Sequence, residues 1–385
     1  MKINMYANDL KSAIKRISGA VDGKSQFFGY VTFVADGNIL AVRAITAKTK
    51  TEIRIADVTI IESGCATVSI DDLKRMSLKG DMVMITTSDG KFSVGNDVKS
   101  YKMADSYCED FSFKLPTFRP EEITCIYADY AESFLKNLAG INATRLEKST
   151  SRVMEGFYLD AENGRIATID GHRLAVADIS ENVQNLADAA FTNGILPGEV
   201  YKILNSVAAD GKIEVSFTPD GKHAYMVGDD FTVLTTLVDG RFFDIEGYLA
   251  ENYDYQIPID TGNMLPVAKE YKQYMGKDKI YDIKYPMVIS CHNGSIMAGI
   301  KDERCQVIDK ICDVSGINDF FFAINPMFII DALSAGKFDS FLMCGKYNHK
   351  MPVTIRAGKF RFMLLPMNIN TNDSLLVDII ARQDK

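Results

Sequence analysis

The chain has 385 residues, of which 47% are hydrophobic and 24% are charged. This composition is typical of a globular protein, and the length exceeds what one hydrophobic core normally serves, so we expect two or three domains. The formal net charge of −8 excludes a chain that is basic over its whole surface, although it leaves room for local basic patches.

The seven cysteines form no C-x-x-C pair and are odd in number, which favours free thiols in a reducing compartment over a disulfide framework. Their spacing suggests no zinc site. The first residues contain no apolar targeting segment, and no run approaches the 18 apolar residues of a transmembrane helix. We therefore expect a cytoplasmic protein that uses no metal or cofactor and contacts no membrane.

Three short helices with one apolar face are predicted at regular intervals along the chain. They are centred on Leu10, Leu135 and Leu265, so successive helices lie 125 and 130 residues apart. In the first of them Leu10, Ile14 and Ile17 recur at three- and four-residue steps, which is the spacing of a helix that buries one face.

A second set of segments has nearly the same period. Each begins with a short apolar strand, continues into a helix, and ends in alternating strands joined at SDG, PDG or NG turns. The corresponding positions at the start of these segments are Ile70, Leu196 and Ile324, at spacings of 126 and 128 residues.

Two sets of segments with one period predict a threefold repeat. We therefore expect an α+β protein with three similar domains, each with two helices packed on antiparallel sheets. The stretches KLPTFRPEEI and YLAENYDYQIP have the composition of linkers. The expected domains are residues 1–120, 121–250 and 251–369, followed by a tail at 370–385.

Lysine and arginine are concentrated in the predicted helices, although the chain as a whole is acidic. The helical windows are residues 10–24, 73–80, 133–152, 200–208, 265–279 and 327–337. Two interpretations are open: these residues occupy ordinary solvated helix faces, or the helices share one face that contacts a polyanion. Since no aromatic residues interleave with the basic ones as in a single-strand platform, the second interpretation favours duplex DNA.

Enzyme signatures are largely missing from the sequence. GAVDGKS at 19–25 has one residue too few between its glycines for a phosphate-binding loop, and neither H-E-x-x-H nor G-x-S-x-G occurs. In TIDGHRLAV, at 168–176, Asp170 could orient His172 as a general base, as in a hydrolase or nuclease. The alternative is a tight Asp-Gly turn with local hydrogen bonds, and it is favoured because no nucleophile or second carboxylate lies nearby.

Three stretches together resemble the signature sequences of one family. TIDGHRLAV at 168–176, LVDGRFFDIEGYL at 237–249 and MLLPMNI at 363–369 are similar to those of the bacterial DNA polymerase III beta subunit, the DNA sliding clamp. The resemblance implies a head-to-tail homodimeric ring of six similar domains that encircles double-stranded DNA without reading its sequence. Such a ring tethers the replicative DNA polymerase as a processivity factor, is placed on DNA by a clamp loader, and catalyses no reaction.

The resemblance also implies a cleft between the second and third domains for the clamp-binding motifs of partner proteins. An apolar pocket of Met, Leu and Ile with a polar rim from His172 and Arg173 fits this role. Some of these positions, Leu364 especially, could equally be plain core. The matching cleft positions are Met154, Ile169, Gly171, His172, Arg173, Leu174, Phe243, Gly247, Tyr248, Met363, Leu364, Leu365, Pro366 and Met367.

DNA contacts and the ring interface are carried over in the same way. The interface is expected to place Tyr101 and Met103, in the edge strand KSYKMAD, against Tyr274 and Met275 of the other subunit. The expected DNA-binding residues are Lys24, Lys74, Lys79, Lys136, Lys148, Arg152, Lys202, Lys269 and Lys272.

The chain departs from the family pattern in three places. Phe243 stands where the family usually has Pro, Asn368 replaces a basic residue, and the chain continues for residues 370–385 where the family normally stops. In this tail, apolar residues from Leu375 to Ile380 recur at helical spacing behind an Asn-Asp-Ser start that could cap a helix. We expect either a helix that docks near the cleft and competes with partner peptides, or a solvated end.

Overall fold

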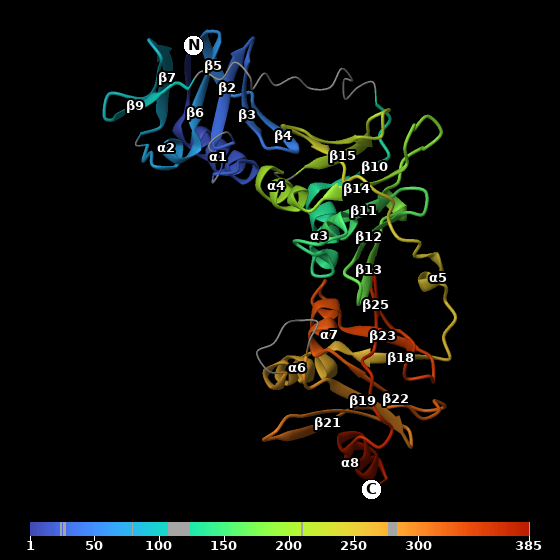
Figure 1. Ribbon diagram of the computed structural model, residues 1–385. Helices are drawn as coiled ribbons and strands as arrows, with labels where there is room; N and C mark the ends of the chain where they lie inside the picture. Colours follow the sequence, from blue (N-terminus) through green and yellow to red (C-terminus); the bar gives the residue numbers. More distant parts are fainter. Residues whose placement is uncertain are drawn as a thin grey trace. The chain divides into compact units, whose positions relative to one another are not determined.

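The computed structural model describes residues 1–23, 25, 28–78, 80–106, 123–208, 211–275 and 283–384. Helices and antiparallel strands follow one another in an order that recurs along the chain (Figure 1), and the expected α+β class is confirmed. The predicted linker near residue 120 lies outside the described residues. In the described part of the chain, no helix combines the length and hydrophobicity needed to span a bilayer.

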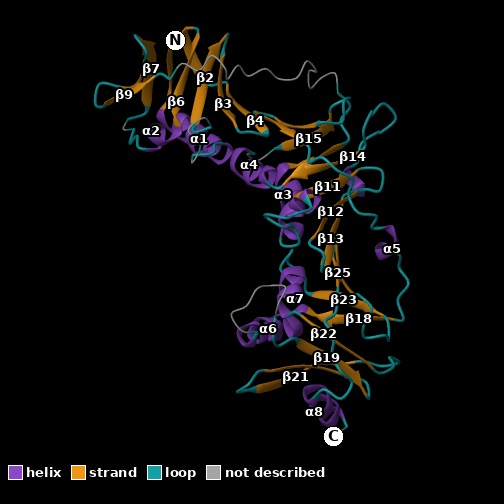
Figure 2. Cartoon of the chain, in the orientation of Figure 1, coloured by secondary structure: helices purple, strands orange, loops and turns teal. Residues whose placement is uncertain are grey.

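Six helices of the described chain overlap the six predicted helical windows, and two further helices lie outside these windows (Figure 2). In the first helix Leu10, Ile14 and Ile17 are all buried, as the spacing predicts. The helices are α1 (Ala7–Ile17), α2 (Ile70–Lys74), α3 (Ala131–Asn142), α4 (Glu199–Val207), α5 (Glu246–Leu249), α6 (Thr261–Tyr271), α7 (Pro326–Leu333) and α8 (Ser374–Gln383).

The predicted helical windows extend beyond the C-terminal ends of the helices. Helix α2 ends at Lys74, and α3 ends at Asn142 rather than near residue 152. After α3 the chain folds back on itself, since the Arg145 guanidinium donates hydrogen bonds to the carbonyl oxygens of Leu146 and Glu155. These side-chain to backbone bonds replace the next helical turn, so Lys148 is not on a helix.

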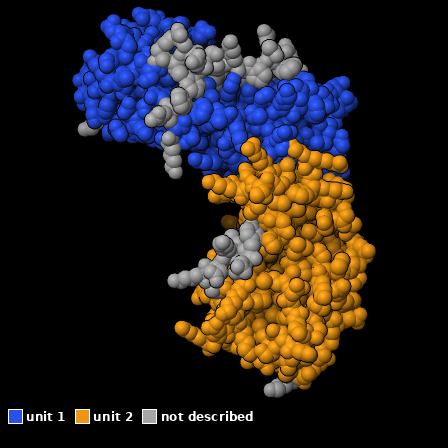
Figure 3. Space-filling view, in the orientation of Figure 1, with its two compact units in different colours: residues 1–135, 159–164, 180–239 blue, residues 136–158, 165–179, 240–385 orange. Residues whose placement is uncertain are grey.

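The described chain forms two compact units (Figure 3). Unit 1 comprises residues 1–135, 159–164 and 180–239, and unit 2 comprises residues 136–158, 165–179 and 240–385. The boundary between the units falls inside the expected second domain, because sheets run across both expected linkers. The division into three domains, at residues 1–120, 121–250 and 251–369, therefore stays a prediction that rests on the sequence repeat.

Unit 1 contains two antiparallel sheets with orders β5-β1-β7-β8-β9 and β10-β15-β16-β17-β4-β3-β2-β6. The predicted turn at SDG is present, with Asp89 and Gly90 both at positive φ. The strands are β1 (Lys2–Tyr6), β2 (Tyr30–Asp36), β3 (Ile39–Ile45), β4 (Thr49–Ile55), β5 (Val58–Glu62), β6 (Gly64–Ser69), β7 (Met82–Ser88), β8 (Lys91–Gly95), β9 (Ser100–Ala104), β10 (Tyr127–Tyr130), β14 (Asn193–Pro197), β15 (Lys212–Phe217), β16 (His223–Gly228) and β17 (Phe231–Thr236).

A junction within unit 1 connects segments on either side of the first expected linker. Strand β17 pairs with β4, so two four-stranded half-sheets become one sheet. Beside this pairing, Arg16 at the end of α1 forms a bidentate ion pair with Asp230, at 2.6 and 2.7 Å, and donates to the Val207 carbonyl at the end of α4. The backbones approach closely, because a Cβ on Gly19 would lie 2.2 Å from the Ser206 Cβ.

In unit 2, strands β12, β13, β25, β24, β23 and β18 pair with one another in this order within one sheet. A second sheet has four strands in the order β21-β20-β19-β22. Strand β13 pairs with β25, which is the counterpart of the β17–β4 pairing in unit 1. The remaining strands are β11 (Gly156–Asp160), β12 (Arg165–Ile169), β13 (Arg173–Asp178), β18 (Tyr255–Asp260), β19 (Met287–His292), β20 (Ser295–Lys301), β21 (Gln306–Asp313), β22 (Phe320–Ile324), β23 (Ser340–Gly345), β24 (Val353–Ala357) and β25 (Phe360–Leu364).

The tail forms a helix, as one of the two expectations states. Helix α8 is capped by Asp373, whose carboxylate accepts the backbone N–H of Leu375 at 2.9 Å. It contacts β19 and β20 (Figure 1). Its Leu375, Leu376 and Ile379 are buried, and Met367 packs against the same apolar cluster. Competition with partner peptides stays a hypothesis.

Candidate functional site

The TIDGHRLAV stretch forms the hairpin between β12 and β13. Ile169 faces Leu174 across the two strands, and Gly171 takes a positive φ of 89°, which a glycine adopts without strain. The Asp170 Oδ1 atom accepts the backbone N–H groups of His172 and Arg173, each at 3.0 Å. The favoured interpretation of this stretch, a tight Asp-Gly turn with local hydrogen bonds, agrees with this geometry.

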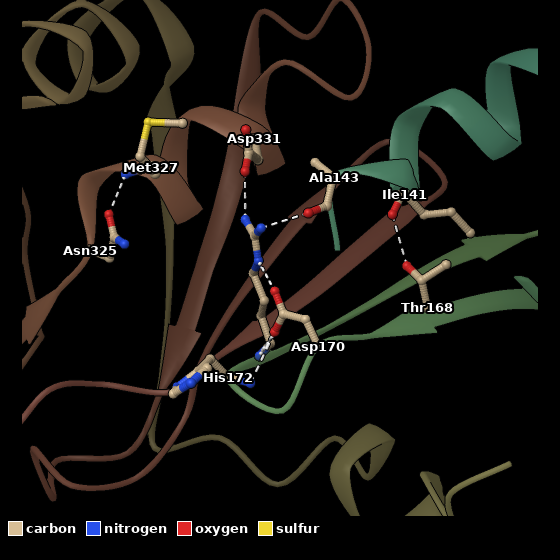
Figure 4. Close-up of polar contacts among 9 residues, drawn as sticks. Ile141, Ala143, Thr168, Asp170, His172, Asn325, Met327 and Asp331 are labelled. Carbon is tan, nitrogen blue, oxygen red and sulfur yellow. Dashed lines mark hydrogen bonds and ion pairs between the residues drawn. The ribbon is translucent and has the colours of Figure 1, made fainter. Parts of the chain in front are cut away.

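The side chain of Arg173 ties this hairpin to two other segments. Its partners Asp170, Asp331 and Ala143 are labelled in Figure 4. Its Nε donates to Asp170 Oδ2 at 2.8 Å, its Nη1 to Asp331 Oδ2 on α7 at 2.6 Å, and its Nη2 to the Ala143 carbonyl oxygen just after α3 at 2.6 Å. The guanidinium also lies 4.5 Å from the ring centre of Phe328, which is a cation–π distance. Arg173 therefore binds the hairpin, α7 and the end of α3 together.

Burial lowers the pKa of Arg173, but the carboxylates of Asp170 and Asp331 outweigh this effect and raise it overall. The guanidinium therefore stays charged. The side chain of Arg173 is 2% exposed, so the expectation that Arg173 forms a polar rim is wrong. A planar guanidinium with five donors can satisfy two carboxylates and a carbonyl at once, which explains why it lies buried.

The hydrolase or nuclease alternative has no support. The Asp170 side chain is fully buried, and both of its oxygens accept hydrogen bonds within the hairpin. A carboxylate held in this way orients a turn instead of a reacting group. Among the described residues, no cluster of His, Cys, Asp or Glu is placed to bind a metal ion.

The second stretch, residues 237–249, is anchored in unit 2 from Gly240 onward. Phe242 stacks on Tyr158, with ring centres 4.5 Å apart. Further along, Arg165 of β12 pairs with Glu246, and Arg361 of β25 donates to the Leu249 carbonyl oxygen at 2.9 Å. These anchors hold the backbone while Phe243 and Tyr248 remain exposed, at 39% and 54%.

The third stretch brings β25 alongside the hairpin. Met363 and Leu364 lie opposite Leu174 and Arg173, and the backbone N–H of Leu365 donates to the His172 carbonyl oxygen at 2.9 Å. The structure therefore places the first and third stretches side by side, and arginines of β12 and β25 hold the second. Arg165, Arg361 and Asp331, which complete this arrangement, were missed because no local sequence pattern marks long-range ion pairs.

The expected cleft residues differ in exposure. The side chains of Arg173, Leu174, Met363 and Leu364 are buried, so Leu364 is core, the alternative raised for it. Partial burial is shared by Met154, Ile169, Pro366 and Met367. The exposed positions are Gly171, His172, Phe243, Gly247, Tyr248 and Leu365.

Most of the expected DNA-binding residues are exposed, and several lie on helices. Lys74, Lys136, Lys202 and Lys269 are on α2, α3, α4 and α6, and Lys272 follows α6. Lys148 and Arg152 are exposed on the segment after α3. Lys24 and Lys79 lie outside the described residues.

Two further basic residues lie near Lys74 in the fold. Lys11 and Lys15 of α1, together with Lys74 of α2, border a pocket of about 280 Å³ whose apolar lining includes Ile14 and Leu73. Both lysines are exposed. The expected set omitted them although they lie within a basic helical window.

The expected interface residues lie at two places in the fold. Tyr101 is on β9, and its hydroxyl accepts the Ser77 N–H at 2.9 Å and donates to the Ser77 carbonyl oxygen at 3.1 Å. Met103, on the same strand, is buried. Tyr274 and Met275 lie just after α6.

Comparison with known proteins assigns this fold to a class. No protein-family model matches the chain. The chain is similar to solved DNA polymerase sliding clamps: that of Bacillus subtilis has a TM-score of 0.84 and 16% identity, over 96% of this chain and all of that one. The DNA polymerase III subunit beta of Pseudomonas aeruginosa has a TM-score of 0.82 at 16% identity, with the same coverage. The chain therefore has the α+β fold of the DNA clamps.

Within that class the chain resembles the bacterial DNA polymerase III beta subunit, and the resemblance found in its three stretches is confirmed. The beta sliding clamp of Escherichia coli is 22% identical over 368 residues, covering 89% of this chain and 92% of that protein. That of Staphylococcus aureus is 26% identical over 201 residues, so the chain matches only 47% of its length.

Proposed function

We propose that this chain is the subunit of a DNA sliding clamp, a non-enzymatic processivity factor that encircles duplex DNA and tethers the replicative polymerase in the cytoplasm. The observation that carries the proposal is the agreement of 96% of the chain with solved clamps at a TM-score of 0.84. The exposed lysines on α2, α3, α4 and α6 support it, because lysines that contact phosphates bind duplex DNA irrespective of sequence.

The repeat supports a head-to-tail homodimer. Within the chain, half-sheets of successive repeats join at two junctions. One junction is the pair β17–β4, and the other is the pair β13–β25. Strand β9, at the end of its sheet, corresponds in order to β17 and β25, whereas β21 corresponds to β4 and β13. Pairing of β9 in one copy with β21 in a second copy would form a third junction, which the described strands do not form within one chain, and two such junctions close a ring.

The same correspondence supports the expected interface residues. Each internal junction places the end of a first helix beside a second helix, as α1 beside α4 and the end of α3 beside α7. The third junction would place the end of α6, with Tyr274 and Met275, beside α2 and β9 of the partner, with Tyr101 and Met103. A clamp loader would have to open one such junction to admit DNA.

We further propose that partner proteins insert clamp-binding peptides over the exposed part of the three stretches. Phe243, Tyr248 and Leu365 supply exposed apolar surface there, and His172 supplies a polar group. Leu365→Ala should weaken binding of a clamp-binding peptide about tenfold, whereas Met351→Ala, at a similarly exposed methionine, should not. Equal affinity of the two variants would count against this site.

The clamp function is tested by loading the protein on nicked circular DNA and then cutting the circle once. A topological ring stays on the circle through gel filtration in moderate salt and slides off after cutting. Release at the same rate from circular and linear DNA would contradict the proposal.

A further inference from the structure

Helix α8 is docked on the four-stranded sheet of unit 2 by apolar contacts. Leu375, Leu376 and Ile379 pack on Val288 and Ala323. Gly299 on β20 makes room for the helix, since a Cβ there would lie 2.8 Å from the Ile379 Cδ1 atom. The sheet surface therefore has a shape that fits this helix.

Polar contacts hold the C-terminal end of the same helix. The Gln383 side-chain amide donates to the carbonyl oxygens of Ser290 at 3.1 Å and of Ser295 at 2.6 Å. His292 lies between the carboxylates of Asp319, at 2.5 Å, and Asp384, at 2.9 Å. With Asp373 capping its start, α8 is fixed at both ends.

Helix α8 also reaches β21, the last strand of the sheet. The Gln306 Nε2 atom donates to Asp378 Oδ2 at 3.0 Å, and the Arg382 Nη1 atom donates to the Ile308 carbonyl oxygen at 3.3 Å. The Ile308 side chain packs against the apolar cluster of α8. Strand β21 is therefore held by its ladder with β20 and, in addition, by a helix.

Strand β21 lies at the end of its sheet, unlike the strands that correspond to it in the other repeats. The corresponding strands β4 and β13 each pair with a strand on both sides, whereas β21 ends its sheet among the described strands. A strand with one unpaired edge is held less firmly and must be ordered before a second strand can add to it. Ordering it in advance lowers the entropic cost of association.

We propose that α8 is an assembly brace: it holds β21 in the conformation that pairs with β9 of a second copy, and thereby strengthens the association of two subunits. The inference rests on the proposed homodimer. It assigns a function to residues 370–385.

The test uses full-length protein in which two exposed side chains are truncated. Asp378→Ala together with Arg382→Ala removes both hydrogen bonds between α8 and β21 described above, but leaves Leu375, Leu376 and Ile379 in place. Ser374→Ala is the matched control, because Ser374 bonds Lys301 of β20 instead of β21. The dissociation constant is measured by sedimentation over a dilution series, and amide hydrogen exchange is followed in residues 306–313.

In the double variant we expect association to weaken about three- to tenfold and exchange in β21 to quicken, with α8 still protected and the control unchanged. Unchanged exchange in β21 would overturn the brace, and so would tighter association, since α8 would then be shielding the edge. If the unaltered protein stays monomeric at every concentration, the homodimer itself fails, and the exchange data still decide whether α8 holds β21.

Discussion

Arg173 illustrates how one buried charge can join distant segments beneath a surface to which it contributes little exposed area. Its guanidinium joins Asp170, Asp331 and the Ala143 carbonyl oxygen, and these groups come from three segments far apart in the chain. We propose that His172 and Leu365 contact partner peptides. His172 is part of the same hairpin, and the backbone N–H of Leu365 donates to its carbonyl oxygen. Arg173 is in this sense a positioning residue.

Arg173→Ala should lower the free energy of unfolding by about 3–5 kcal/mol, because it leaves the buried Asp170 carboxylate without its partner. Urea unfolding followed by circular dichroism measures the loss. The exposed Arg152→Ala is the control and should change the free energy by less than about 0.5 kcal/mol. A similar small effect in both variants would show that the buried network contributes little.

The contacts of His292 predict that the docking of α8 depends on pH. Burial lowers the pKa of His292, but the ion pairs with Asp319 and Asp384 outweigh it and raise the pKa above 6.5. Since the folded pKa is raised, the protonated imidazole stabilises the docked helix. This contribution is complete below about pH 6.5 and is lost as the pH rises through the folded value.

We therefore expect hydrogen exchange in α8, corrected for the intrinsic pH dependence, to quicken as the pH rises from 6 to above the folded pKa of His292. His292→Asn should abolish this pH dependence, whereas His172→Asn, on the hairpin of unit 2, should leave it intact. A pH profile that is the same in all three proteins would assign the effect to another group.

At the scale of elements, α8 and its sheet are fitted to each other. Gly299 is an unfavourable residue inside a strand, yet its missing side chain makes space for Ile379 and Leu375. The similar use of Gly19 beside Ser206 lets α1 and α4 approach in unit 1. Small residues thus mark the places where elements meet most closely.

Gly299→Val tests this fit, because valine favours strands but would collide with the helix. We expect it to weaken docking of α8 by about 1–3 kcal/mol through overpacking, seen as faster hydrogen exchange in residues 375–383. Adding Ile379→Ala to the variant should restore part of the protection by making room. Failure of the second change to rescue would mean that the strand itself, and not the helix contact, was disturbed.

At the scale of the whole molecule, the proposed ring would stay on DNA because it encloses the duplex, and not because it binds the duplex tightly. A closed ring needs only weak phosphate contacts, because it leaves circular DNA by opening rather than by dissociation. The chain has a net charge of −8, so its lysines on helices are a local feature. Binding of the unloaded protein to duplex DNA should accordingly be weak and sensitive to salt.

Lys74→Gln and Lys202→Gln should each reduce the dependence of DNA binding on salt, by about one in the slope for every phosphate that the removed lysine neutralised. Lys222→Gln is the control, since Lys222 is an exposed lysine in a hairpin turn. Binding measured by fluorescence anisotropy at several salt concentrations gives the slopes. An equal change in all three variants would show that charge alone, and not position on the helices, is responsible.

Local patterns by themselves determined several elements of this protein, although not where each helix ends. The three- and four-residue steps from Leu10 to Ile17 predicted a helix with that face buried, and the Asn-Asp-Ser start before Leu375 made a capped helix one of the two expectations for the tail. These features depend on neighbours along the chain, so they can be predicted from periodicity and capping chemistry. The Asp170–Gly171 turn belongs to the same group.

Only the tertiary structure decided which elements meet and which charges are buried. Arg173 was expected at an exposed rim, but it pairs with Asp331, 158 residues away, and Arg16 pairs with Asp230, 214 residues away. Such partners are selected by packing and by the cost of leaving a buried charge unpaired, and no local spacing encodes them. The docking site of α8 on β19 and β20 also depends on tertiary structure, because its shape is formed by a sheet of strands that are distant from α8 in the sequence.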